Sequence, residues 1–271
     1  MSREETPEEL LGEKEGQGED RPGVLSCLTA PVLVKIIGIY SATAVSLISF
    51  FVLASDASLA EKALIKMALG LILIWVILGG SLMYVFRRPV RRFVRKIPLT
   101  WQVKFFLFCV LLALLEEGVT VSMTNLAPRF GAEVGEAFVT ASAHYLHTVL
   151  FHSVIVFLPM FLAWTVLLRT FAFSPAQVFL LFGLTGSIAE MSINPTNVLA
   201  GFWFFVYGLM VYLPAYSLPE ERGARSPVWW AYLLAVGAPL VSPILLLPFA
   251  PLLRYLWEIM DPVFFVDSMW G

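Results

Sequence analysis

Long apolar segments recur along the chain and are separated by short polar connections. About 20 helical residues cross the roughly 30 Å hydrocarbon core of a bilayer, so each such segment predicts a membrane-spanning helix. The sequence therefore predicts an all-α fold, a polytopic transmembrane helical bundle of about seven spans. The predicted spans cover residues 34–54, 63–86, 101–123, 145–168, 175–193, 198–216 and 228–247.

The last predicted span differs from the others because it contains Pro239 and Pro243 and is followed by Pro248. Proline removes a helical hydrogen bond and bends or breaks the helix. We therefore expect this segment to be kinked or broken. Six spans followed by a re-entrant or interfacial segment is the alternative.

Basic residues set the expected orientation. The segment 87–96, RRPVRRFVRK, has six basic residues in ten, and positively charged loops stay on the cytoplasmic side. The fourth and sixth spans also return to basic residues, to Arg169 in one case and to Arg222 and Arg225 in the other. The amino terminus is therefore predicted inside and the carboxyl terminus outside, in a multi-pass protein of the cell membrane. Residues 258–271 are then expected to lie at the outer surface.

Composition supports the same class, since 59% of the 271 residues are hydrophobic and only 14% are charged. Such a chain is too apolar for a soluble domain. Eight of the twenty acidic residues lie in the first twenty positions, which predicts a disordered acidic cytoplasmic tail over residues 1–30. A transmembrane domain is expected over residues 31–257. The expected partners are the lipid bilayer and a membrane protein subunit or further copies of the chain, with no nucleic acid.

Three carboxylates interrupt the apolar spans. Glu116 and Glu117 lie in the third span and Glu190 lies in the fifth. At 1.5 Å per residue, the pair lies roughly 20 Å and Glu190 about 21 Å above the cytoplasmic edge, so the three share a depth in the outer half. A charged carboxylate within the hydrocarbon costs roughly 2.5–3.5 kcal/mol. These residues are therefore the first candidates for a functional site.

The histidines of the chain fall in the same half of the membrane. His152 lies about 25 Å above the end of the fourth span, and His144 and His147 lie nearer the outer surface. Two amide side chains, Asn194 and Asn197, follow the glutamate of the fifth span within two helical turns. They form a further polar site beside the carboxylates.

This group of residues has three chemical interpretations. A desolvated glutamate with His152 as its partner can act as a general base or carry protons, which makes Glu116, Glu117 and His152 the candidate catalytic residues. Imidazole and carboxylate groups also suit a divalent transition metal such as Zn, Fe or Mn. The candidate metal ligands are His144, His147, His152, Glu117 and Glu190. In the third interpretation the acids are neutral or solvated near the outer interface, and the histidines satisfy backbone groups.

The longest connection in the body of the protein links the third and fourth spans over residues 125–144. Its segment 132–147, AEVGEAFVTASAHYLH, is predicted to be a helix that continues into the fourth span.

A glutamate pair late in one span, followed by the sequence FGL at 182–184 in a later span, resembles the CAAX-protease and bacteriocin-processing family of intramembrane proteases. In that family an Arg stands at the fourth place after the Glu pair, a second motif has Phe and His four apart, and a third has His and Asn four apart. Here no Arg follows the pair and Gly186 stands at the His position of the second motif. Glu190 and Asn194 have the spacing of the third motif.

The resemblance implies a helical intramembrane protease in which Glu116 or Glu117 is the base that activates water. The histidine role would fall to His147 or His152. Two other classes stay open beside this hydrolase: a proton- or ion-coupled transporter or channel, and a non-catalytic structural or assembly subunit of a membrane complex. The shared depth of the acids and histidines favours the hydrolase as the hypothesis for the site, and the sequence leaves open whether the protein is an enzyme.

Overall fold

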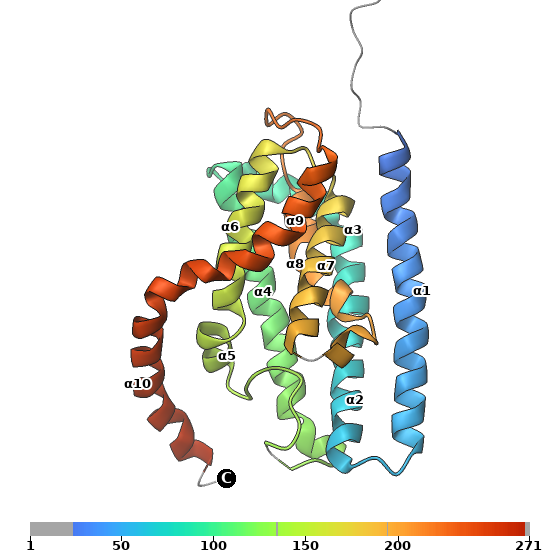
Figure 1. Ribbon diagram of the computed structural model, residues 1–271, viewed down its shortest axis with the longest axis vertical. Helices are drawn as coiled ribbons and strands as arrows, with labels where there is room; N and C mark the ends of the chain where they lie inside the picture. Colours follow the sequence, from blue (N-terminus) through green and yellow to red (C-terminus); the bar gives the residue numbers. More distant parts are fainter. Residues whose placement is uncertain (1–23, 134, 194, 269–271) are drawn as a thin grey trace, which may run out of the picture.

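The computed structural model describes residues 24–133, 135–193 and 195–268, and this part of the chain is helical apart from its connections (Figure 1). Its one isolated bridge joins Phe171 to Arg225. The acidic tail predicted at the amino terminus lies outside the described residues up to position 23. The all-α prediction is confirmed.

Ten α-helices occur in the described residues: α1 (Val24–Ala54), α2 (Leu59–Leu71), α3 (Gly80–Lys96), α4 (Trp101–Asn125), α5 (Tyr145–Phe151), α6 (Val154–Thr170), α7 (Pro175–Ile193), α8 (Trp203–Tyr216), α9 (Trp229–Val241) and α10 (Ala250–Ser268). Four tighter or wider helical segments connect them: the π-helix Ile72–Gly79 and the 3₁₀ segments Ala127–Phe130, Pro195–Val198 and Ser242–Phe249. The π-helix makes α2 and α3 one continuous rod.

Four helices among the described residues are long and apolar enough to cross a membrane, or five if the bent pair α5 and α6 is one span. The four cover Ala30–Ala54, Leu59–Lys96, Trp101–Asn125 and Trp229–Ile259. Large apolar side chains on their outer faces are open to the surroundings, which is what a lipid-facing surface requires. A multi-pass membrane protein is therefore supported, while the count of seven spans and the orientation of the termini stay predictions.

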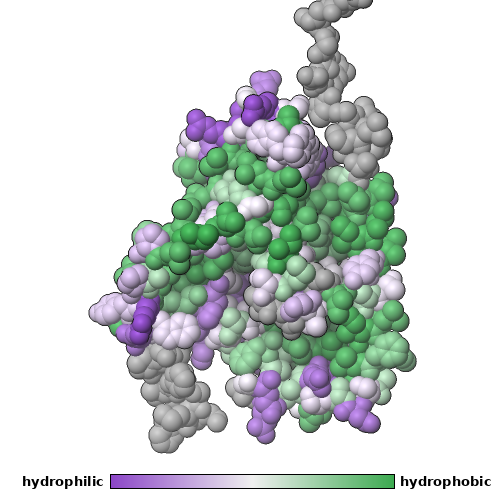
Figure 2. Space-filling model, viewed as in Figure 1, coloured by the Kyte–Doolittle hydropathy of each residue, from purple (hydrophilic) through white to green (hydrophobic). Residues whose placement is uncertain are grey.

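The surface is also divided as expected for a membrane protein. Hydrophobic side chains cover most of the middle of the molecule, and hydrophilic side chains gather toward its two ends (Figure 2). Ile39, Leu73 and Leu233, on three different helices, are 69%, 60% and 68% exposed. Such exposure on every side is typical of a bundle whose solvent is lipid.

The proline-rich last span does not end at its prolines. The chain changes from α9 to a 3₁₀ segment and then continues into α10, which swings away from the bundle (Figure 1). The helix passes position 247, where the prediction placed its end, and runs to Ser268. Pro243 stands at the start of the 3₁₀ segment, where a missing N–H costs little, whereas Pro239 lies inside α9 and Pro248 inside the 3₁₀ segment, where they deform the helix.

Local sequence explains where several helices begin and end. Ser58 and Glu61 form a capping box at the start of α2, with the Glu61 N–H donating to Ser58 Oγ at 3.2 Å and the Ser58 N–H donating to Glu61 Oε2 at 2.8 Å. At the end of α3, the cations Arg95 and Lys96 lie beside the negative end of the helix dipole.

Small residues allow α7 and α8 to approach closely. A Cβ at Gly183 would lie 2.5 Å from the backbone oxygen of Phe204, closer than real contacts allow. Gly186 in the next turn faces the ring of Tyr207 in the same way. Glycine at such positions lets helix backbones touch in membrane bundles. This contact fixes α8 against α7, and thereby places Tyr207.

Large buried rings fill the half of the bundle near the basic segment 87–96. Phe161 and Phe182 have their centroids 5.6 Å apart, and Trp164 and Phe173 have theirs 5.7 Å apart. Trp164, Phe161 and Phe182 are fully buried, as is Phe105 in α4. We call these five residues the aromatic barrier. Its rings pack closely against one another and against their neighbours.

Replacing Gly183 by Ala should destabilise the bundle, because the new methyl group meets backbone and cannot be relieved by a change of rotamer. We expect the free energy of unfolding to fall by about 1–3 kcal/mol. Detergent-purified protein unfolded by heat or by a denaturing detergent gives the measurement. The matched control is Gly237→Ala in α9, where a Cβ meets nothing within 4 Å and the change should stay below about 1 kcal/mol. Equal stabilities of the two variants would contradict the close contact.

Candidate functional site

Three carboxylates from two helices lie close together inside the bundle. Glu116 and Glu117 come from α4 and are each only 3% exposed. Glu190 comes from α7, and its charge lies within interaction range of both. The Tyr207 hydroxyl of α8 lies within range of all three acids. We call these four residues the carboxylate cluster.

The Glu117 carboxylate is held through one oxygen. The Thr120 hydroxyl, one turn farther along α4, lies 3.0 Å from Glu117 Oε1 and 3.0 Å from the main-chain carbonyl of Glu117, so two acceptors share its one hydrogen. Thr140, from the connection before α5, donates to Oε1 at 2.6 Å. Hydroxyl donors on a carboxylate make short, strong hydrogen bonds. Both hydroxyl groups lie on the Oε1 side of the carboxylate.

The Glu190 carboxylate is held through both oxygens. The Tyr207 hydroxyl donates to Oε1, and the Asn197 side-chain amide donates to Oε2 at 3.0 Å. Asn197 lies in the 3₁₀ segment after α7, and α1 fixes the residues that follow it. Tyr40 donates to the Leu199 carbonyl at 2.9 Å, and the next residue of α1 binds the neighbouring carbonyl. The predicted polar residue Asn194 lies outside the described residues.

The connection before α5 descends to the glutamate pair instead of forming a helix. The prediction of a helix over 132–147 is wrong, since only Ala127–Phe130 and the residues from Tyr145 onward are helical. Gly131 and Gly135 have φ angles of 97° and 90°, which reverse the chain. Asn125 then donates to the Ala143 carbonyl at 2.8 Å and draws the connection against the end of α4.

This descent is deep. Thr140 reaches Glu117, which lies eight residues, or about 12 Å, before the end of α4. Non-helical backbone at such a depth is tolerated only where protein or water surrounds it. The side of the bundle that holds the carboxylate cluster is therefore built from polar, irregular segments, in contrast to the aromatic barrier.

Two of the histidines meet at the break between α5 and α6, where the helix axis bends by 44°. The rings of His147 and His152 are 5.1 Å apart, and Trp257 of α10 lies 4.2 Å from the first and 5.5 Å from the second. The charge of His152 interacts with that of Glu117. His144 lies at the start of α5, where its backbone N–H donates to Ser142 Oγ at 3.1 Å.

The geometry does not gather the predicted metal ligands. Among the described residues, no three His, Cys, Asp or Glu side chains converge closely enough to hold a metal ion. The set His144, His147, His152, Glu117 and Glu190 therefore stays a prediction from the sequence. The hydrogen bonds to the carboxylates and the electrostatic interaction of His152 with Glu117 are features that the metal-free interpretation uses.

Comparisons with known proteins leave the family undetermined. No family model, curated protein or solved structure matches the chain. The resemblance to CAAX proteases thus stays a prediction that depends on the glutamate pair and the FGL segment.

Sequence reasoning missed the hydroxyl groups of the site. Thr120 carried a usable signal, because it follows Glu117 by three residues and so shares its helix face. Thr140 and Tyr207 carried none, because their places depend on the fold of the connection and on the contact between α7 and α8. They are long-range partners that no local spacing encodes.

Replacing Thr140 by Val keeps the shape of the side chain and removes the donor to Glu117. Losing a buried hydrogen bond costs about 1–3 kcal/mol, so we expect the connection to open locally and the amides of 135–144 to exchange about tenfold faster. Hydrogen exchange followed by mass spectrometry measures this. The control is Thr170→Val at the exposed end of α6, where the hydroxyl donates to Val166 O in its own helix. Unchanged exchange in Thr140→Val would contradict the anchoring role.

Proposed function

We propose that the protein is a membrane-embedded hydrolase that cleaves an ester or amide bond in the outer half of the bilayer, with Glu117 as the general base. The observation that carries this proposal is the one-sided anchoring of Glu117. Two hydroxyl groups hold Oε1 at 3.0 and 2.6 Å in a site where the carboxylate is 3% exposed. A carboxylate that is held in place within a buried site can act as a general base on a water molecule beside it.

The reaction follows from the placement of the groups. Glu117 Oε2 takes a proton from a water molecule, and the water oxygen attacks the carbonyl carbon of the substrate. The bond to the leaving group then breaks, and the proton held by Glu117 passes to that group. The products are an acid and an alcohol or amine, so one oxygen atom from water enters the acid. His152 lies within electrostatic range of Glu117.

The other acids have a supporting role in this proposal. Glu190 accepts hydrogen bonds from Tyr207 and Asn197, so its negative charge is spread over fixed donors. Glu116 lies within charge range of both Glu117 and Glu190. Charges crowded in one buried site favour holding a proton there. The cluster can therefore keep the proton that Glu117 must return to the leaving group.

The aromatic barrier favours hydrolysis over transport. A proton or ion carrier requires a polar path on both sides of its binding site. Here the opposite half of the bundle is closed by fully buried rings, among them Phe161, Trp164 and Phe182. In this proposal water and substrate enter from the outer half.

A purely structural role explains the acids less well. Buried ionisable groups add little to stability compared with apolar residues of the same size. Here two helices, the connection before α5 and the segment after α7 position hydroxyl and amide donors around them. The resemblance to the CAAX-protease family, in which a glutamate activates water, supports the same assignment of Glu116 or Glu117.

Replacing Glu117 by Gln should abolish hydrolysis while the bundle stays folded, because Gln keeps the acceptor for Thr120 and Thr140 but cannot take a proton. We expect the rate to fall by about 10²–10⁴-fold. The protein is reconstituted in vesicles in H₂¹⁸O with two probes, a transmembrane peptide and a diacyl phospholipid. Mass spectrometry then detects ¹⁸O in newly formed carboxyl groups.

The matched control is Glu133→Gln, which removes an exposed carboxylate in the same connection. It should keep the wild-type rate. Failure of the wild type to incorporate ¹⁸O into either probe, or a Glu117→Gln variant as fast as the wild type, would contradict the proposal. A vesicle pH change that depends on Glu117 without ¹⁸O incorporation would indicate transport instead.

A further inference from the structure

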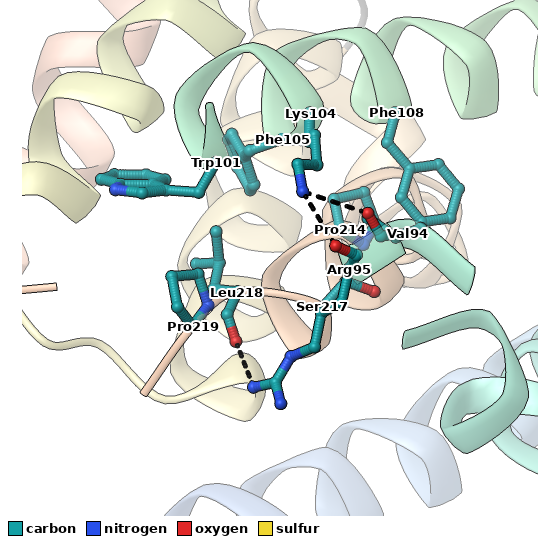
Figure 3. A pocket seen from close by; sticks show the side chains of 10 residues that line it. All are labelled: Val94, Arg95, Trp101, Lys104, Phe105, Phe108, Pro214, Ser217, Leu218 and Pro219. Atoms are coloured by element: carbon teal, nitrogen blue, oxygen red, sulfur yellow. Dashed lines mark hydrogen bonds between the residues drawn. The ribbon is translucent and has the colours of Figure 1, made fainter. Parts of the chain in front are cut away.

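A pocket lies at the opposite end of the bundle from the carboxylate cluster, where α3 ends and α4 begins (Figure 3). The end of α8 closes its third side. Its volume is about 240 Å³, several times the roughly 30 Å³ that one water molecule takes up in the liquid. Phe105, Phe108 and Pro214 form apolar walls, so a polar group can enter only from the rim.

The charge of the rim is positive. Arg95 and Lys104 are the two ionisable side chains among the ten residues that line the pocket. The nearest acid along the chain, Glu220, accepts a hydrogen bond from Arg91. This bond and the charges of Arg91 and Arg95 lower the pKa of the Glu220 carboxyl below its usual range. One carboxylate therefore faces Arg91, Arg95 and Lys104, and the charge near the pocket stays positive.

Donor groups remain for an anion. Lys104 Nζ donates to the carbonyls of Val94 and Arg95 at 3.2 and 3.5 Å, which occupies two of the three N–H groups of an ammonium. The Arg95 guanidinium has five N–H groups, and one of them reaches the Leu218 carbonyl at 3.5 Å. Figure 3 shows the two side chains directed toward these carbonyls at the edge of the pocket.

The start of α4 adds a further positive element. Its first helical residue, Trp101, lines the pocket, and the preceding Thr100 does not cap the helix with its side chain. The first backbone N–H groups of a helix and the positive end of its dipole attract phosphate. The basic side chains and the helix start thus act on the same space.

The surroundings indicate that the anion belongs to a lipid. Trp101 is half-buried at the end of a span, where indole rings prefer the interface between water and lipid. On the outward face of α4 and just before it, Leu99, Val103 and Leu107 are 48%, 42% and 51% exposed. An acyl chain can follow this face while the headgroup enters the pocket. Free phosphate has no acyl chain and would make no contact with this apolar face.

We propose that the pocket between α3, α4 and α8 binds the phosphate headgroup of an anionic phospholipid, with Arg95, Lys104 and the start of α4 as the recognising groups. This site is independent of the hydrolase proposal. Basic pockets between helices on the cytoplasmic side are a common form of lipid headgroup recognition. By the positive-inside rule, the neighbouring segment 87–96 predicts that this pocket faces the cytoplasm.

The test compares lipid binding by the full, delipidated protein. Native mass spectrometry with dioleoyl phosphatidylglycerol, dioleoyl phosphatidylcholine and inorganic phosphate gives three apparent affinities. We expect the anionic lipid to bind about tenfold more tightly than the zwitterionic one, and Arg95→Gln to remove most of this preference because a charge-assisted hydrogen bond is lost. Lys104→Gln should have the same effect, with its thermal stability measured in parallel because Lys104 also binds the end of α3.

The matched control is Arg88→Gln, an exposed arginine of the same basic segment that does not line the pocket. Its preference for the anionic lipid should change by less than about twofold. Equal losses in Arg88→Gln and Arg95→Gln would overturn the proposal, because they would show a diffuse basic surface. Equal binding of the two lipids would also overturn it. So would full competition by inorganic phosphate at lipid concentrations, which would make the ligand a free anion.

Discussion

A carboxylate inside a membrane bundle requires donors from the protein, and this requirement organises one half of the molecule. Glu117 and Glu190 receive four hydrogen bonds from Thr120, Thr140, Tyr207 and Asn197. Two of these donors lie on irregular segments that reach back toward the helices. The connection before α5 and the segment after α7 therefore have the shapes that the buried acids need.

The other half of the molecule is packed mainly with apolar rings. Phe161, Trp164 and Phe182 pack without exposure against their neighbours, and the charged side chains Arg95 and Lys104 lie at the rim of the pocket beside the basic segment. The bundle thus has a polar side and an apolar side. The proposed hydrolysis belongs to the polar side, and the proposed lipid site lies at the basic end.

The sequence predicted the parts of the fold that depend on local pattern. Apolar length predicted the spanning helices, and counting residues placed Glu116, Glu117 and Glu190 at one depth, where the structure brings their charges within range. Long-range features escaped prediction. Thr140 reaches Glu117 only because Gly131 and neighbouring turns reverse the chain. The composition of this connection predicted a helix and gave no sign of the reversal. The prolines of the last span predicted a kinked or broken helix, and the chain there changes to 3₁₀ geometry before it continues as α10.

The central claim is that the carboxylate cluster is reached from one side only. The most direct measurement is thiol labelling of sealed vesicles with a membrane-impermeant reagent, after Cys27 and Cys109 have been replaced. Thr140→Cys probes the polar side and Phe161→Cys probes the aromatic barrier. We expect the first to be labelled from the outer face alone and the second from neither face. Labelling of Thr140→Cys from both faces, or of Phe161→Cys from the cytoplasmic face, would show a path through the bundle and contradict the account.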